Sequence, residues 1–207
     1  MGFTLLELFE MGGIIMWPLL LFSIAAVALT LERTIFLLYH NLKMYDLKER
    51  VEAAVRSGNI GEAREFLESQ TKRRMGARIL LALLKREGLS EHRLEKAVEA
   101  EAATCINSLE NGFNFLTALG SISPLTGFLG TVTGMISAFK SIAEAADVNA
   151  QIVAAGIYEA LITTVFGLCI AILAMFAHSV FTHIVDRFTG DVESVCSDLI
   201  ITLTEKQ

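Results

Sequence analysis

Long apolar stretches alternate with charged ones along this chain. Three stretches with almost no charged residues, 13–31, 116–139 and 157–180, are long enough for a helix to cross a bilayer, which takes roughly 20 apolar residues. The sequence between them is charged and rich in helix-forming residues. The pattern predicts an all-α integral membrane protein with three transmembrane helices.

The charged stretches predict further helices outside the membrane. Residues 42–56 have a helical pattern that ends at Ser57-Gly58-Asn59, and residues 60–69 have a second one. From Ser90, where Ser, Arg93 and Leu94 are suited to a helix start, the pattern continues into the second span. Valines and leucines recur at helical spacing through 181–207. The second and third spans are therefore predicted to extend into a helical domain.

The distribution of basic residues predicts the orientation. Of 17 Lys and Arg residues, 14 lie between Arg33 and Lys96, and the side richer in basic residues is the cytoplasmic one. The N-terminus is then periplasmic and the C-terminus cytoplasmic. The predicted order is an N-terminal periplasmic or interfacial segment (1–12), the first span (13–31), a cytoplasmic helical domain (32–115), the second span (116–139), a short periplasmic loop (140–156), the third span (157–180) and a cytoplasmic C-terminal helix (181–207).

Composition excludes several classes of protein. With 53% hydrophobic residues and a mean hydropathy of +0.54, the chain is too apolar for an ordinary soluble domain. Three cysteines and four scattered histidines show no disulfide or metal-ligand spacing, so the cysteines are expected to be packing residues. No arrangement typical of a catalytic site is present, and no cofactor is expected. The basic run Lys72-Arg73-Arg74 is short and has glutamates nearby, which favours a solvated face over nucleic-acid binding.

Small residues form a stripe on each of the last two spans. In a membrane helix, small residues mark close contact with another helix, and spacings of three and four residues place them on one face. On the second span the stripe comprises Gly120, Pro124, Gly127, Thr131, Gly134 and Ala138, with Gly130 assigned to the same packing set. On the third it comprises Ala160, Thr164, Gly167, Ala171, Ala174 and His178.

Each stripe contains one threonine, and the two are expected at similar depth. Because the spans run in opposite directions, Thr131 and Thr164 both lie roughly 10 to 12 Å below the outer surface at 1.5 Å per residue. Two interpretations stay open. The hydroxyls either bond to their own helix while the stripes serve packing, or they line a path for protons. Proton relays in membranes use groups that change charge, which threonine cannot do.

The acid that such a path needs is missing from the deep part of the spans. The only carboxylate within them is Glu159, at the outer end of the third, where it either serves the path or simply reaches interfacial water. If the stripes face a proton path, another subunit has to supply the titrating carboxylate. The stripes would then also enclose the partner helix that carries it.

The motifs of these spans resemble those of a known family. SPLTGFLGTVTGMISAF (Ser123 to Phe139) and IYEALITTVFGLCIA (Ile157 to Ala171) look like the signature spans of the MotA/TolQ/ExbB proton-channel superfamily, in its ExbB/TolQ branch. The resemblance covers nearly the whole chain, although the first span and the charged segment match in layout alone. One departure is Ala171-Ile172-Leu173, where many relatives have Ala-Ile-Pro; loss of that proline would remove a kink.

The resemblance implies a proton-driven motor in the bacterial inner membrane. Members form homopentamers around the helices of a dimeric ExbD- or TolR-like partner with one membrane aspartate, and act on a TonB- or TolA-like protein. Thr131, Thr164 and Glu159 would be the pathway residues, with protons as the coupling ion. An ExbB-like role in TonB-dependent import and a TolQ-like role in envelope maintenance and division stay open. A membrane scaffold without ion conduction is the alternative of another class.

Overall fold

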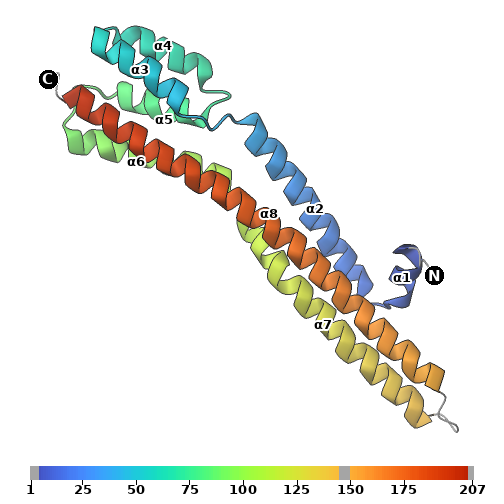
Figure 1. Cartoon of the computed structure of the whole chain (residues 1–207). Coiled ribbons are helices and arrows are strands. Elements are labelled where there is room, and N and C mark those ends of the chain that lie inside the picture. The colour runs from blue at the N-terminus through green and yellow to red at the C-terminus, as the bar shows by residue number, and fades with distance from the viewer. Residues whose placement is uncertain (1–4, 145–149, 205–207) are drawn as a thin grey trace. The chain divides into compact units, whose positions relative to one another are not determined.

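The computed structural model describes residues 5–144 and 150–204, and all regular elements within them are α-helices (Figure 1). This confirms the all-α prediction. The helices are α1 (Leu5–Met11), α2 (Met16–Tyr39), α3 (Tyr45–Ser57), α4 (Ile60–Gln70), α5 (Met75–Leu84), α6 (Glu91–Glu110), α7 (Phe113–Glu144) and α8 (Ala150–Thr204).

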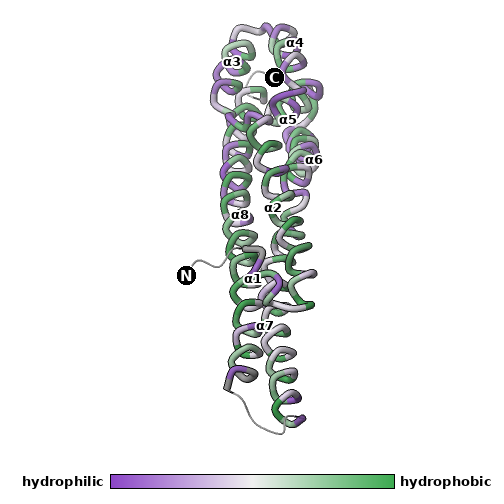
Figure 2. Tube along the Cα trace, turned by 90° about the vertical axis from the view of Figure 1, so that its right-hand side faces the viewer, coloured by the Kyte–Doolittle hydropathy of each residue, from purple (hydrophilic) through white to green (hydrophobic). Residues whose placement is uncertain are grey.

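Three helical segments in the described residues are long and apolar enough to cross a membrane. They are Met16–Tyr39, Glu91–Glu144 and Ala154–Thr204, in agreement with the three predicted spans. Figure 2 shows hydrophobic residues dominating α2, α7 and the adjoining part of α8, and hydrophilic residues frequent on α3, α4 and α6. The chain is therefore a multi-pass membrane protein with a charged helical part.

The chain divides into two compact units. The first, here called the apolar unit, contains Met1–Glu32 and Gly112–Ser179. The second, here called the charged unit, contains Arg33–Asn111 and Val180–Gln207. The boundaries fall inside α2 and α8 and between α6 and α7, so the two units share two helices.

The core of the charged unit is built around α5. Residues 75–77 and 79–84 are buried, and α5 packs against α4 and α6. The amphipathic helix α3 adds Leu47, Val51 and Val55, which are four residues apart and fully buried. The sequence analysis did not predict α5. All of its residues except Arg78 are buried, as expected for a helix enclosed by its neighbours.

The turn between α3 and α4 follows the prediction. Gly58 has a φ of +80°, a left-handed conformation that glycine adopts without steric cost. The Gly58 N–H donates to the Val55 carbonyl at 3.2 Å and the Asn59 N–H to the Ala54 carbonyl at 2.9 Å, as in a Schellman motif. At the start of α6, Ser90 occupies the predicted N-cap position, but its side chain makes no capping hydrogen bond.

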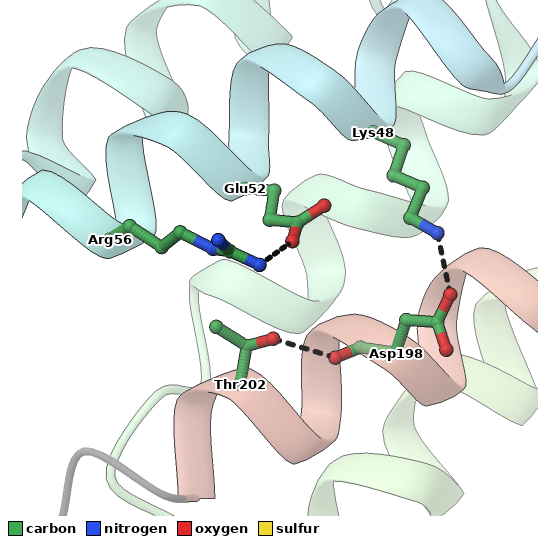
Figure 3. A network of polar contacts seen from close by, with 5 residues as sticks. All are labelled: Lys48, Glu52, Arg56, Asp198 and Thr202. Carbon is green, nitrogen blue, oxygen red and sulfur yellow. Dashed lines mark hydrogen bonds and ion pairs between the residues drawn. The ribbon is translucent and has the colours of Figure 1, made fainter.

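Ion pairs link the elements of the charged unit. Figure 3 shows the Lys48 ammonium group on α3 bonded to the Asp198 carboxylate on α8, at 2.5 Å. This hydrogen bond raises the pKa of Lys48. In the basic run, Arg74 pairs with Asp46 at 2.7 Å and lowers the pKa of that carboxyl group. Arg78, four residues after the run, pairs with Glu101 at 2.9 Å, so Arg74 and Arg78 both neutralise carboxylates of their own chain.

The helical course from Ser90 into the second span is interrupted once. α6 ends at Glu110 and α7 begins at Phe113, with Gly112 between them at a φ of +87°. A residue in the left-handed region ends the helical hydrogen-bond pattern. The Asn111-Gly112 pair is a known turn signal, and the prediction of an unbroken helix overlooked it.

The third span does continue without interruption. α8 runs through 55 residues from Ala150 to Thr204, and Ala171-Ile172-Leu173 lies inside it. The predicted outer loop 140–156 is largely helical, because α7 extends to Glu144 and α8 starts at Ala150. Residues 145–149, including Asp147, lie outside the described part.

Two of the three cysteines are buried in the charged unit, and we expect them to resist alkylation. Cys105 is 1% exposed and Cys196 4%. Burial raises the pKa of Cys105, and that of Cys196 to about 12. Because the thiolate is the reactive form, a Cys169→Ser variant should react slowly with N-ethylmaleimide at pH 8 and expose two thiols in SDS.

The matched control for this labelling is Ser57→Cys in the same background, which adds an exposed thiol at the end of α3. It should label rapidly without denaturant. Rapid labelling of the Cys169→Ser variant before denaturation would contradict the burial of both thiols.

Candidate functional site

Glycines allow the backbones of α7 and α8 to touch. A Cβ atom added at Gly127 would lie 2.7 Å from the Thr163 carbonyl oxygen and 3.0 Å from the Thr164 Cα atom. One added at Gly167 would lie 2.5 Å from the Ser123 carbonyl oxygen. These neighbours are backbone atoms that cannot rotate away, so the close approach requires glycine at both positions.

The same contact continues toward the ends of the two helices. A Cβ atom at Gly134 would meet the Ala160 Cβ atom at 3.2 Å, and one at Gly120 would meet the Met175 side chain. At Gly130 an added Cβ atom would lie 2.6 Å from the Thr163 Cβ atom. Figure 1 shows the two helices side by side along this length.

The two predicted stripes therefore face each other within one chain. The buried stripe residues are Gly120, Gly127, Gly130, Gly134, Ala138, Ala160, Gly167, Ala171 and Ala174, and Pro124 is half-buried inside α7. Small-residue spacing indicates contact but not the identity of the contacting helix. That the stripes also enclose a helix of another subunit stays a prediction.

The predicted pathway threonines have different hydrogen bonds. The Thr131 hydroxyl donates to the Phe128 carbonyl of its own helix at 2.6 Å, which is the bond expected under the packing interpretation. The Thr164 hydroxyl donates across to the Gly127 carbonyl on α7 at 3.2 Å. Both residues are half-buried in the single chain.

A third threonine, Thr163, lies at the centre of the α7–α8 contact and was not predicted. It is 1% exposed, and its hydroxyl is 2.8 Å from the Ala160 carbonyl and 3.2 Å from the Gly127 carbonyl. The predicted stripe contains Thr164 and residues three or four positions away from it, so the adjacent Thr163 was not included. The sequence feature that could have identified it is the Thr-Thr pair, together with two glycines on the other span.

Ser123 adds another hydroxyl to the same helix pair. Its side chain is 0% exposed, and its oxygen has no hydrogen-bond partner among the described residues. It precedes Pro124, which has no N–H and so removes one bond from the α7 ladder. This turn of α7 therefore has unused hydrogen-bonding capacity.

Glu159 lies beside the turn that joins α1 and α2. Gly13 has a φ of +68°, and a Cβ atom there would overlap the Glu159 carboxylate. The carboxylate also lines an open cavity of about 800 Å³, whose other polar side chains are Ser137, Ser141, Gln151 and Tyr158. A carboxylate in an open cavity near the end of a span suits either exchange of protons with water or simple hydration.

His178 lies near the other end of the third span. It is half-buried, and its ring packs edge-to-face on Phe113, with 5.9 Å between the ring centroids. Such aromatic contacts stabilise helix packing. In the described residues no cluster of His, Cys, Asp or Glu is arranged to hold a metal ion.

The fold and the contact define a multi-pass helical membrane protein whose last two spans pack closely through glycines and threonines. The model of the MotA/TolQ/ExbB proton channel family matches residues 61–194, and the chain belongs to this family. The predicted resemblance is confirmed.

Relatives cover both named groups of the ExbB/TolQ branch. The chain is 33% identical over 207 residues to the biopolymer transport protein ExbB-like 1 of Synechocystis sp., covering 97% of this chain and 80% of the relative. It is 28% identical to ExbB of Pseudomonas putida, covering 78% of this chain and 47% of the relative. It is 46% identical to the Tol-Pal system protein TolQ of Haemophilus influenzae over 74 residues, or 36% of this chain and 32% of the relative.

Proposed function

We propose that this protein is the channel subunit of a proton-driven motor in the bacterial inner membrane. The observation that carries the proposal is the chemistry of the two contacting spans. They bring hydroxyl groups together at Gly127, yet in sequence Glu159 and His178 near the ends of the third are the only titratable acid or histidine side chains in 116–139 and 157–180. A path for protons across this region needs a carboxylate from another subunit.

A single-span partner of the ExbD or TolR type would supply that carboxylate. Membership in the family supports this partner. The hydroxyl of Thr164 suits a role beside it, because a threonine hydroxyl both donates and accepts hydrogen bonds. Its 3.2 Å bond to Gly127 is longer than a typical O–H···O bond and is readily exchanged for a stronger one to a carboxylate.

The remaining assignments follow from this mechanism. Glu159 and the open cavity beside it would form the outer approach to the path, and the basic segment 33–96 would be cytoplasmic. Large apolar side chains such as Phe128, Phe139 and Phe176 are exposed on the single chain and would contact lipid and neighbouring copies in a homopentamer. Each proton crossing a potential of 100 mV releases about 2.3 kcal/mol, which would move the partner helices. The proton is the coupling ion in this mechanism, which needs no cofactor.

Two pathways are supported by specific relatives. The ExbB-like protein of Synechocystis sp. matches over 97% of this chain, which favours an ExbB-like role that energises import through a TonB-like protein. The higher identity to TolQ is confined to 74 residues and supports a TolQ-like role through a TolA-like protein as the second candidate.

The test is proton uptake by vesicles that contain this chain and its partner. With an imposed potential, we expect uptake that requires both proteins and is lost when the membrane carboxylate of the partner is replaced by its amide. If the complex assembles but conducts no protons, the scaffold alternative holds and the motor proposal fails.

A further inference from the structure

Two threonine hydroxyls compete for one carbonyl oxygen at the α7–α8 contact. The Gly127 oxygen lies 3.2 Å from both the Thr163 and the Thr164 hydroxyl oxygens. A carbonyl oxygen has two lone pairs, and in the regular helix α7 one of them accepts the N–H four residues later, that of Thr131. One lone pair is left for two hydroxyls.

Thr163 has a second acceptor, whereas Thr164 has the Gly127 carbonyl alone among the residues that the structure describes. The Thr163 hydroxyl is also 2.8 Å from the Ala160 carbonyl in its own helix. A hydroxyl has one hydrogen to donate, so Thr163 can serve either Ala160 or Gly127 at a given moment. When Thr164 donates to Gly127, Thr163 can donate to Ala160, and both hydrogens are used.

The surroundings of Thr163 hold its side chain in place for this exchange. It is 1% exposed and packs against Gly130, where an added Cβ atom would lie 2.6 Å from the Thr163 Cβ atom. In helices threonine populates two χ1 rotamers, because its hydroxyl can bond the carbonyl three or four residues earlier. Close packing against Gly130 restricts the choice between these rotamers and keeps the Thr163 hydroxyl beside the Gly127 carbonyl.

We propose that Thr163 is a positioning residue that allows the Thr164 hydroxyl to leave Gly127 and bind the carboxyl group of the partner. When the Thr164 hydroxyl turns to the carboxyl group of the partner, the Thr163 hydroxyl moves from Ala160 to Gly127 and occupies the vacated lone pair. The contact between α7 and α8 then stays closed while Thr164 is engaged. This inference rests on the proposed function, since it gives Thr164 a carboxyl group to bind.

The test compares hydroxyl and volume at position 163 in the vesicle assay. Thr163→Val keeps the volume and loses the hydroxyl, and Thr163→Ser does the reverse. We expect Val to lower proton uptake roughly two- to tenfold, the effect of one hydrogen bond on a barrier, and Ser to stay near the unsubstituted level. A residue needed only for packing gives the opposite order, with Ser worse than Val.

Further variants separate the possible failures. Thr133→Val is the matched control, because the Thr133 hydroxyl bonds only carbonyls of its own helix; it should conduct normally. If Thr163→Val does not assemble, Thr163→Ala against Thr163→Ser gives the same comparison. The double variant Thr163→Val/Thr164→Val should be no worse than Thr164→Val alone, because Thr163 acts through Thr164.

Two outcomes overturn different claims. If Thr164→Val stops uptake while Thr163→Val conducts normally, or Ser is the worse replacement, the role of Thr163 is refuted and the motor proposal stands. If Thr164→Val itself conducts normally, the pathway role of Thr164 falls, and the role of Thr163 falls with it.

Discussion

Replacing Thr164 by valine is expected to lower proton uptake by about 100-fold, the scale on which removing one positioned hydrogen-bond donor slows a charge-transfer step. Valine has nearly the same shape as threonine, so the contact with α7 persists. The lost group is the hydroxyl that bonds Gly127 across the helix pair at 3.2 Å. Vesicle uptake, with assembly checked by size-exclusion chromatography, measures the effect.

Thr131→Val tests the other predicted pathway residue. Its hydroxyl already has a short hydrogen bond of 2.6 Å to the Phe128 carbonyl, and this bond has to break before the hydroxyl can bind the carboxyl group of the partner. We therefore expect a smaller loss of proton uptake than at Thr164. Thr133→Val again serves as the control for removing a membrane hydroxyl. Normal coupled uptake in both the Thr131 and Thr164 variants would refute their assigned roles.

Gly127→Ala is expected to disrupt the pairing of α7 and α8. The new methyl group would lie 2.7 Å from the Thr163 carbonyl oxygen and 3.0 Å from the Thr164 Cα atom, and no side-chain rotation relieves a clash with backbone. The helices have to separate, which also breaks the bonds to both threonines. Overpacking of this kind costs about 1–3 kcal/mol or more, and thermal unfolding in detergent should show a clear loss of stability.

Gly190→Ala is the matched control for that substitution. Gly190 lies in α8, and a Cβ atom there meets nothing within 4 Å. Alanine favours the helix over glycine by about 1 kcal/mol, so this variant should unfold at the same or a higher temperature. If Gly127→Ala were as stable as Gly190→Ala, the close backbone contact would be disproved.

The main elements of the fold were predictable because they depend on local patterns. Apolar length identified the three spans, and Ser57-Gly58-Asn59 identified the end of α3. The helix α5 was missed because a short apolar run of 10 residues does not by itself distinguish a buried helix from a buried strand. The break at Gly112 was signalled by Asn-Gly, but the surrounding helical pattern concealed it.

The candidate site was predictable in its residue types and less so in its partners. Spacing assigns Gly127 and Gly167 each to one face of a helix, since periodicity places residues on a face. It does not say which helix covers that face, and the structure pairs the two stripes with each other. Thr163 was missed for a related reason: its role depends on the opposing Gly127 and Gly130, and such a tertiary match is invisible in one helix alone.

The glycine between α6 and α7 has a consequence for how torsion travels along the chain. Of the three places where the polypeptide passes between the two units, α2 and α8 are continuous helices, and the third contains Gly112 with a φ of +87°. A helix resists twisting because each turn is tied to the next by hydrogen bonds, whereas backbone bonds at a glycine turn easily. Torsion applied to α7 would thus be taken up at Gly112, whereas in α8 the unbroken hydrogen-bond ladder links the span to residues 181–204.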